Sequence, residues 1–118
     1  MGVEISNIEL LNKIINGTVD GDIDWLFIGK TTDKFMFIYP YNLVGKKFII
    51  TELDIFKNKM KNKLIVYMQN ITSDDKFIIK KVGFNSRLYE LTKIVIDITT
   101  PESSWKNDFD EIRSIYGI

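Results

Sequence analysis

The hydrophobic positions of residues 7–16 recur at helical spacing. Ser6 and Glu9 follow the order of a capping box, in which the Ser6 hydroxyl accepts a hydrogen bond from the Glu9 amide. Asn16-Gly17 then supplies a pair that is suited to a left-handed stop. The apolar stripe consists of Ile8, Leu11, Ile14 and Ile15. The pattern therefore predicts a short amphipathic helix over residues 7–16.

Between Ile23 and Ile98 the apolar residues alternate with polar ones, which is typical of strands. Pro40 is expected to end the second strand, because proline has no N–H to donate to a neighbouring strand. The links are short and polar, whereas a parallel crossover needs about a dozen residues or more. The pattern therefore predicts an antiparallel meander. Its expected strands are 25–28, 35–39, 48–56, 64–68, 77–82 and 93–98.

A second amphipathic helix is predicted at the C-terminus. Thr100 can cap it, Pro101 suits the first helical position, and Glu102 complements the helix dipole. Its apolar stripe consists of Trp105, Phe109, Ile112 and Tyr116. Together these elements predict a single α+β domain over residues 1–118. We expect one antiparallel sheet of about five to six strands, flanked by a short N-terminal helix and this C-terminal helix.

The composition limits the available chemistry. The chain has no His and no Cys, which removes the commonest general base, the thiol nucleophile and the usual transition-metal ligands. We therefore expect no enzyme, no cofactor and no metal site. No apolar run reaches the ~20 residues of a spanning helix, and no leader segment is recognisable, so we expect a cytoplasmic protein that does not enter the membrane. The excess of lysine over arginine indicates an AT-rich coding sequence, compatible with a phage or other mobile element.

Three short motifs suggest chemistry but depart from the pattern that it needs. Gly29-Lys30-Thr31-Thr32 resembles the end of a phosphate-binding loop, yet Asp24 stands where that loop needs glycine. The acidic turn 20–24 opens like a calcium loop, but Trp25 occupies the position of its obligatory glycine. Glu52 and Asp54 share one face of a strand, as paired catalytic carboxylates would, although such pairs normally converge from separate elements. A solvent-facing acidic row is the more ordinary interpretation.

Charge is unevenly distributed although sixteen basic and sixteen acidic residues cancel over the whole chain. Residues 55–93 carry a net charge of +6, and the segments on either side carry −3 each. Lysines without interleaved arginine or aromatic residues favour a soluble loop over base contact. Nucleic-acid binding through this basic hairpin is nevertheless the alternative function. The residues that would bind are Lys57, Lys59, Lys61, Lys63, Lys80 and Lys81.

The sequence favours a protein-binding module that acts by occluding its partner, in the manner of an immunity protein or a virus-encoded inhibitor. Small size, few catalytic groups and strands that are apolar on both faces support this hypothesis. We also expect self-association, because an uncovered apolar strand face is commonly buried in a dimer. The candidate contact residues are Trp25, Tyr39, Tyr41, Glu52, Asp54 and Tyr67.

Overall fold

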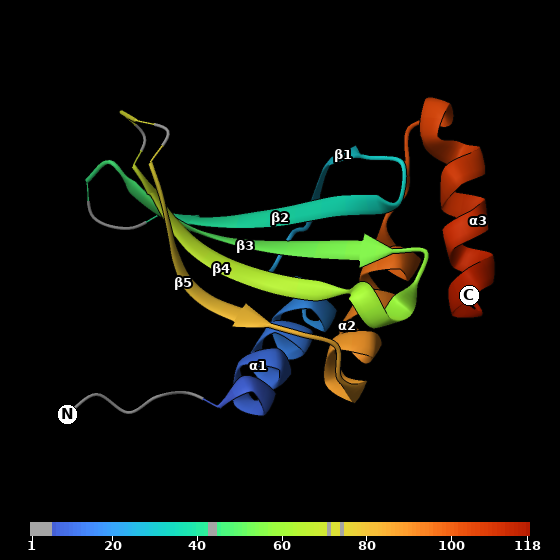
Figure 1. Cartoon of the computed structure of the whole chain (residues 1–118), viewed down its shortest axis with the longest axis horizontal. Helices are drawn as coiled ribbons and strands as arrows, with labels where there is room; N and C mark the ends of the chain where they lie inside the picture. The colour runs from blue at the N-terminus through green and yellow to red at the C-terminus, as the bar shows by residue number, and fades with distance from the viewer. Residues whose placement is uncertain (1–5, 43–44, 71, 74) are drawn as a thin grey trace. The chain divides into compact units, whose positions relative to one another are not determined.

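The computed structural model describes residues 6–42, 45–70, 72–73 and 75–118 (Figure 1). The chain divides into two compact units. A sheet unit comprises residues 25–84, and a helical unit comprises the segment up to Asp24 together with residues 85–118. The single domain expected over residues 1–118 stays a prediction. Over the described residues, no helix is both long enough and apolar enough to span a bilayer.

The sheet unit is a five-stranded antiparallel meander in which each strand pairs with the next one along the chain. Figure 1 shows the strands side by side in that order. The predicted α+β class with one antiparallel meander sheet is therefore confirmed. The strands are β1 (Leu26–Lys30), β2 (Lys34–Asn42), β3 (Lys47–Phe56), β4 (Lys63–Asn70) and β5 (Lys76–Val82).

The prediction that Pro40 ends the second strand is wrong. β2 continues to Asn42, and Pro40 pairs with Ile50 of β3. β1 pairs with β2 only over Phe35–Ile38, so one edge of β2 has no neighbouring strand at Pro40. Sheets tolerate proline at such positions, because no ladder hydrogen bond is lost there.

Residues alternate between two faces along the central strands. One face of β2, β3 and β4 carries the buried apolar side chains Phe35, Phe37, Leu53, Ile55 and Leu64. Phe27 of β1 adds to this group, with its ring centroid 5.9 Å from that of Phe35 and 5.3 Å from that of Phe37. The opposite face carries Glu52 and Asp54 among half-buried residues. The alternation predicted from the sequence therefore separates an apolar face from a mixed one.

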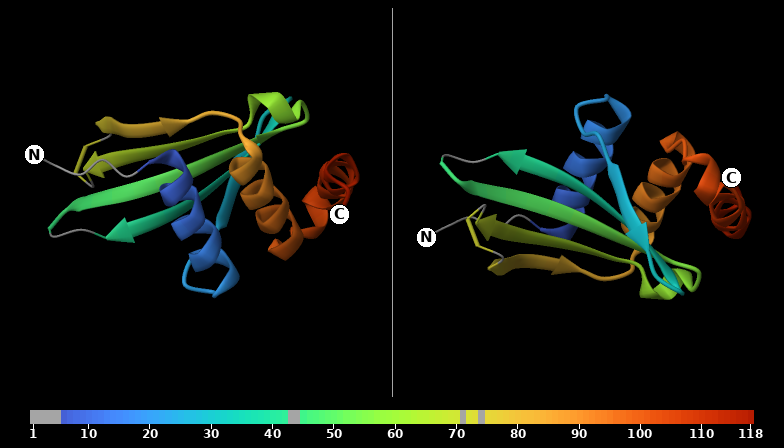
Figure 2. Two further views of the ribbon diagram at one scale, coloured as in Figure 1. Left: turned by 90° about the horizontal axis from the view of Figure 1, so that it is seen from below. Right: turned by 90° about the horizontal axis from the view of Figure 1, so that it is seen from above.

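The helical unit contains α1 (Asn7–Val19), α2 (Ser86–Ile98), a 3₁₀ turn η2 (Ser103–Trp105) and α3 (Lys106–Tyr116). α1 lies beside α2, and α2 contacts α3 (Figure 2). The Ser6 hydroxyl accepts from the Glu9 amide at 3.2 Å, as the capping box predicts. The prediction that the helix ends at Asn16-Gly17 is wrong. α1 continues to Val19, and the residue with left-handed backbone is Gly21, with φ of 83°.

The sixth strand predicted over 93–98 is a helix. α2 begins after Asn85, whose side chain accepts from the Leu88 amide at 2.9 Å. The segment is rich in β-branched residues, which favour strands locally. Its buried residues are nevertheless spaced as one helical stripe, and tertiary burial overrides local propensity. They are Leu88, Leu91, Thr92, Val95 and Ile96.

The C-terminal helix is confirmed, but its predicted start is wrong. α3 begins at Lys106 after η2, and Glu102, which caps η2, makes no side-chain capping hydrogen bond. The apolar stripe of α3 is buried at Phe109, Ile112 and Tyr116. The Arg113 guanidinium donates to the Thr99 carbonyl oxygen at 2.6 Å, which ties α3 to the end of α2.

Candidate functional site

Three of the predicted contact residues come together on the mixed face of the sheet unit. In the strand register Glu52 lies opposite Ile65 and Ile50 lies opposite Tyr67, so Glu52 and Tyr67 are diagonal neighbours. Asp54 is on the same face and is 1% exposed. The structure therefore groups Glu52, Asp54 and Tyr67, whereas the sequence indicated a shared face for Glu52 and Asp54 alone.

Two lysines neutralise the buried Asp54. The Lys34 Nζ lies 3.3 Å from Asp54 Oδ2, and the Lys63 Nζ lies 4.0 Å from the same oxygen. Both lysines are partly exposed, and they come from β2 and β4 on either side of β3. A buried carboxylate is costly unless it is paired, so this ion-pair cluster links the three central strands. Sequence reasoning assigned Lys63 to the basic hairpin and missed its contact with Asp54.

Glu52 is poised to hold a proton near neutral pH. Burial, followed by a hydrogen bond to Asp54 and the Asp54 charge, raises the pKa of Glu52 to about 7, against the opposing charges of Lys34 and Lys76. Asp54 Oδ1 is buried and accepts no hydrogen bond from the described residues. The hydrogen bond between the Glu52 and Asp54 carboxyl groups needs a proton on one of them, and the raised pKa of Glu52 favours that residue as the donor. Burial and the two carboxylate charges also raise the pKa of the Tyr67 phenol.

This arrangement is better suited to holding strands together than to acid–base chemistry on a substrate. Asp54 is almost fully buried, and its Oδ2 is occupied by Lys34. Tyr67 is 7% exposed, and the Lys76 Nζ lies 5.0 Å from the centre of its ring. Only Glu52 has a partly exposed carboxyl. The cluster therefore presents one proton-binding group and no open pair of carboxylates.

The other three predicted contact residues lie elsewhere in the sheet unit. Tyr39 pairs with Thr51 on the face opposite Glu52 and Asp54, and its ring centroid lies 4.7 Å from that of Trp25 in an edge arrangement. Burial raises the pKa of the Tyr39 phenol, although a hydrogen bond with the Thr51 side chain partly offsets this. Tyr41 is 64% exposed further along β2. The six candidates are thus divided between two faces.

The basic residues of the alternative function gather at one end of the sheet unit. Lys57, Lys59 and Lys61 lie in the β3–β4 connection, which contains the 3₁₀ turn η1 (Lys59–Lys61). The pairing of Ile65 with Lys81 brings the end of β5 to the same end of the sheet. The buried Asn62 holds this connection, because its Oδ1 accepts from the Phe56 amide at 2.7 Å. The structure thus brings the predicted lysines together, with Lys63 directed to Asp54.

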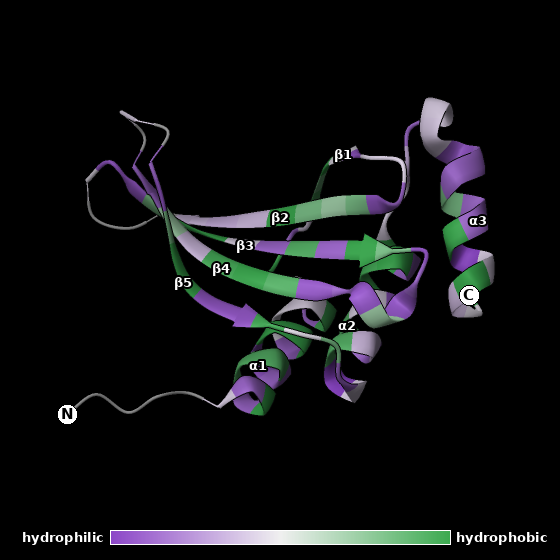
Figure 3. Cartoon of the chain, in the orientation of Figure 1, coloured by the Kyte–Doolittle hydropathy of each residue, from purple (hydrophilic) through white to green (hydrophobic). Residues whose placement is uncertain are grey.

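Among the described residues of the sheet unit, sequence reasoning missed a run of exposed apolar side chains. Phe77, Ile78 and Ile79 are consecutive in the edge strand β5 and are 77%, 59% and 52% exposed. Figure 3 shows a hydrophobic stretch of β5 that gives way to a hydrophilic end. The available signal was three consecutive apolar residues between lysines, which the sequence equally allows for a buried strand. We call residues 76–81 the β5 edge.

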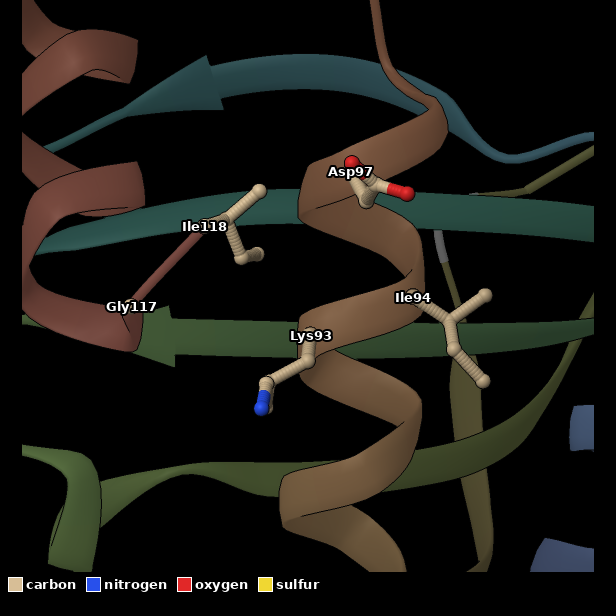
Figure 4. A pocket seen from close by; sticks show the side chains of 5 residues that line it. All are labelled: Lys93, Ile94, Asp97, Gly117 and Ile118. Atoms are coloured by element: carbon tan, nitrogen blue, oxygen red, sulfur yellow. The ribbon is translucent and has the colours of Figure 1, made fainter.

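The helical unit carries a shallow depression of about 300 Å³ (Figure 4). It is lined by Lys93, Ile94, Asp97, Gly117 and Ile118 and is widely open to solvent. Ligand pockets are normally concave, mostly enclosed and lined with convergent polar groups. This depression has neither enclosure nor such convergence, so we assign it no function.

The described part of the chain contains no cluster of side chains that could bind a metal ion. No group of three or more acidic residues there is arranged so that it could hold an ion, the acidic turn 20–24 included. Asp20 instead ends α1, where its amide donates to the Asn16 carbonyl oxygen at 2.9 Å.

Comparison of the chain with protein-family models, with curated proteins and with solved structures gives no match in any of the three.

Proposed function

We propose that this protein is a non-enzymatic binding module that occludes a partner protein, with the β5 edge as its contact surface. The observation that carries the proposal is the exposure of Phe77, Ile78 and Ile79 in one run. Contiguous apolar side chains on an edge strand mark an interaction site or an aggregation hazard. Occlusion of an enzyme, as by an immunity protein or a virus-encoded inhibitor, needs such a surface and no catalytic group.

Burial of the apolar side chains of the β5 edge would contribute enough free energy for binding. Full burial of one large apolar side chain contributes about 1.5–3 kcal/mol, and a few such residues usually dominate an interface. Phe77 is the most exposed of the three and the largest. We therefore assign it the anchoring role, with Ile78 and Ile79 beside it.

Affinity capture with matched variants tests the proposal. The double variant Phe77→Ser/Ile79→Ser removes two side chains that are largely exposed, so its fold should be retained, which circular dichroism checks. Leu26→Ser/Ile28→Ser is the control, because these residues are 52% and 50% exposed on β1 at the opposite edge of the sheet. We expect proteins that are retained by the unsubstituted chain and by the control to be lost from the β5 variant. Identical retention by all three proteins would refute the β5 edge as the contact surface.

A second candidate function is nucleic-acid binding by the basic end of the sheet unit. The observation that favours it is the gathering of Lys57, Lys59 and Lys61 with Lys80 and Lys81 at that end. Counterion release then predicts affinity that falls linearly with salt on a logarithmic scale. A mobility shift at ~50 mM salt that Lys59→Glu/Lys61→Glu abolishes would support it. The absence of any shift at that salt concentration would eliminate it.

A further inference from the structure

We propose that the β5 edge takes up an extended acidic segment of the partner as a sixth antiparallel or parallel strand of the sheet. This inference rests on the protein-binding function proposed above and specifies the kind of partner. Strand addition of this type supplies affinity through backbone hydrogen bonds and selectivity through alternate side chains.

The register of β5 favours a strand as the occupant. Phe77 pairs with Met68 and lies on one face of the sheet, whereas Ile78 pairs with Tyr67 and lies on the other. The pairing then moves from Ile78 to Lys80, so a β-bulge leaves Ile79 without an opposite residue on β4. A helix or a flat surface that docked on one face would cover only one of these apolar side chains. A strand that pairs along the edge places its own side chains beside both.

The strand order leaves β5 available for such pairing. It is the last strand of the sheet and pairs with β4 alone among the described strands. An edge strand presents unpaired backbone N–H and C=O groups to any extended chain that approaches. β1, at the other edge, is five residues long and β5 is seven residues long. β5 therefore offers the longer edge for backbone pairing.

Charge selects an acidic segment. β5 contains Lys76, Lys80 and Lys81 and no acidic residue. The whole sheet unit holds eleven lysines against five acidic residues, a net charge of +6. Opposite charges across paired strands stabilise the pair and like charges destabilise it. Acidic side chains in the added strand would complement the lysines at both ends of the apolar run.

The same lysines argue against a second copy of this chain as the occupant. Pairing of two β5 strands would bring six lysines together with no acidic residue from either strand. Edge lysines and β-bulges are the devices by which sheets discourage pairing between identical edges. The β5 edge therefore rejects itself and remains open to a strand of opposite charge.

Selection from a displayed library of random eight-residue peptides tests the proposal. The full-length protein is the bait, and Phe77→Ser/Ile79→Ser serves for counter-selection. We expect enriched peptides that alternate acidic and apolar residues and that bind the bait at least tenfold more tightly than this variant. Leu26→Ser/Ile28→Ser should bind them as the unsubstituted chain does. Enrichment of basic peptides, or no enrichment against the variant, would overturn the proposal.

Backbone pairing is tested with the best selected peptide and its N-methylated counterpart. The two peptides have the same side chains, but the methylated one cannot donate along the edge. We expect methylation to weaken binding at least tenfold, and the unmodified peptide to slow amide exchange over residues 76–82. Equal binding of the two peptides would overturn strand addition. A concentration-dependent dimer in analytical ultracentrifugation that the β5 variant abolishes would also overturn the proposal, because the occupant would then be a second copy. Displacement of the peptide by a single-stranded oligonucleotide would overturn it as well, because the surface would then bind nucleic acid.

The two proposals fail in different ways. If capture depends on Phe77 and Ile79 but no acidic peptide binds, the partner class is wrong and the binding module stands. If acidic peptides bind the β5 edge while capture is the same for all variants, strand addition stands and the contact surface proposed for the cellular partner is wrong.

Discussion

The Glu52 carboxyl links the ionisation of one residue to the stability of the fold. Its pKa rises from the ordinary value of 4.5 to about 7, first because it is buried and then because Asp54 is its neighbour. Between these two values the folded chain binds more protons than the unfolded chain. The proton on Glu52 therefore contributes to the free energy of unfolding. This contribution is complete below pH 4.5 and is lost as the pH rises through 7.

The first prediction is that Glu52→Gln reduces this loss of stability. A neutral glutamine imitates the protonated acid and keeps an N–H donor for the neighbouring Asp54 carboxylate. Compared with the unsubstituted chain, we expect the variant to gain about 1 kcal/mol more at pH 8 than at pH 5, a figure reduced for partial solvent screening. Urea denaturation at the two pH values measures the difference. The exposed Glu102→Gln should show no such dependence, and an equal effect of both substitutions would contradict the prediction.

The second prediction concerns the lysine that neutralises Asp54. Lys34→Met keeps most of the length of the side chain but leaves a carboxylate that is 1% exposed with only the Lys63 Nζ at 4.0 Å. Removal of one partner of a buried ion pair is strongly destabilising, because the remaining charge is under-compensated. Since Lys63 stays in place, we expect a loss of about 2 kcal/mol in the free energy of unfolding.

The control for this substitution is Lys106→Met in α3. Its partner Asp110 lies 3.2 Å away, but both side chains are more than half exposed. Such surface pairs contribute little to stability. Comparable losses from the two substitutions in urea denaturation would show that the burial of Asp54 does not govern the effect.

At the scale of secondary-structure elements, the sequence specifies some elements better than others. The meander follows from period-two alternation, and its short links leave antiparallel pairing as the only economical connection. α2 was missed because Ile94, Val95 and Ile96 favour a strand locally, whereas burial of a stripe that begins at Leu88 decides the helix. Asn85 was a readable start signal that alternation obscured.

The candidate site was predictable only in part for the same reason. Glu52 and Asp54 share a face because side chains alternate along a strand, and this could be foreseen. Tyr67 joins them only through the register between β3 and β4. Which lysines reach Asp54 depends on the registers of β2 and β4 against β3, and no local pattern states those registers. The exposure of Phe77 depends on β5 being the last strand, which is a property of the whole sheet.

The third prediction tests the start of α2. Asn85→Ala removes the side-chain acceptor of the Leu88 amide, while Asn85→Asp keeps it. Loss of an N-cap acceptor costs about 1 kcal/mol, so we expect the alanine variant to lose that amount and the aspartate variant to lose much less. Thermal or urea unfolding measures the two variants. Equal stability of both would mean that the Asn85 hydrogen bond does not stabilise α2.

On the scale of the whole molecule, a formal net charge of zero conceals a strong separation of charge. The sheet unit carries +6, and the helical unit, with five basic and eleven acidic residues, carries −6. The division into units makes the separation clearer than the order along the chain, where the acidic residues form two distant segments. Surface charges interact over about 10 Å at 0.1 M salt, so a partner that binds the sheet unit responds mainly to the lysines close to it.

The fourth prediction follows from this separation. We expect the protein to bind a cation exchanger at pH 7 and about 0.1 M salt despite its formal neutrality, because the sheet unit presents its lysines locally and more distant charges are screened. Lys59→Glu/Lys61→Glu and Lys13→Glu/Lys93→Glu change the net charge equally, the first pair in the sheet unit and the second in the helical unit. If local charge governs retention, only the first pair elutes at markedly lower salt. Equal shifts for both pairs would mean that net charge decides, and the electrostatic argument for an acidic partner at the β5 edge would lose its basis.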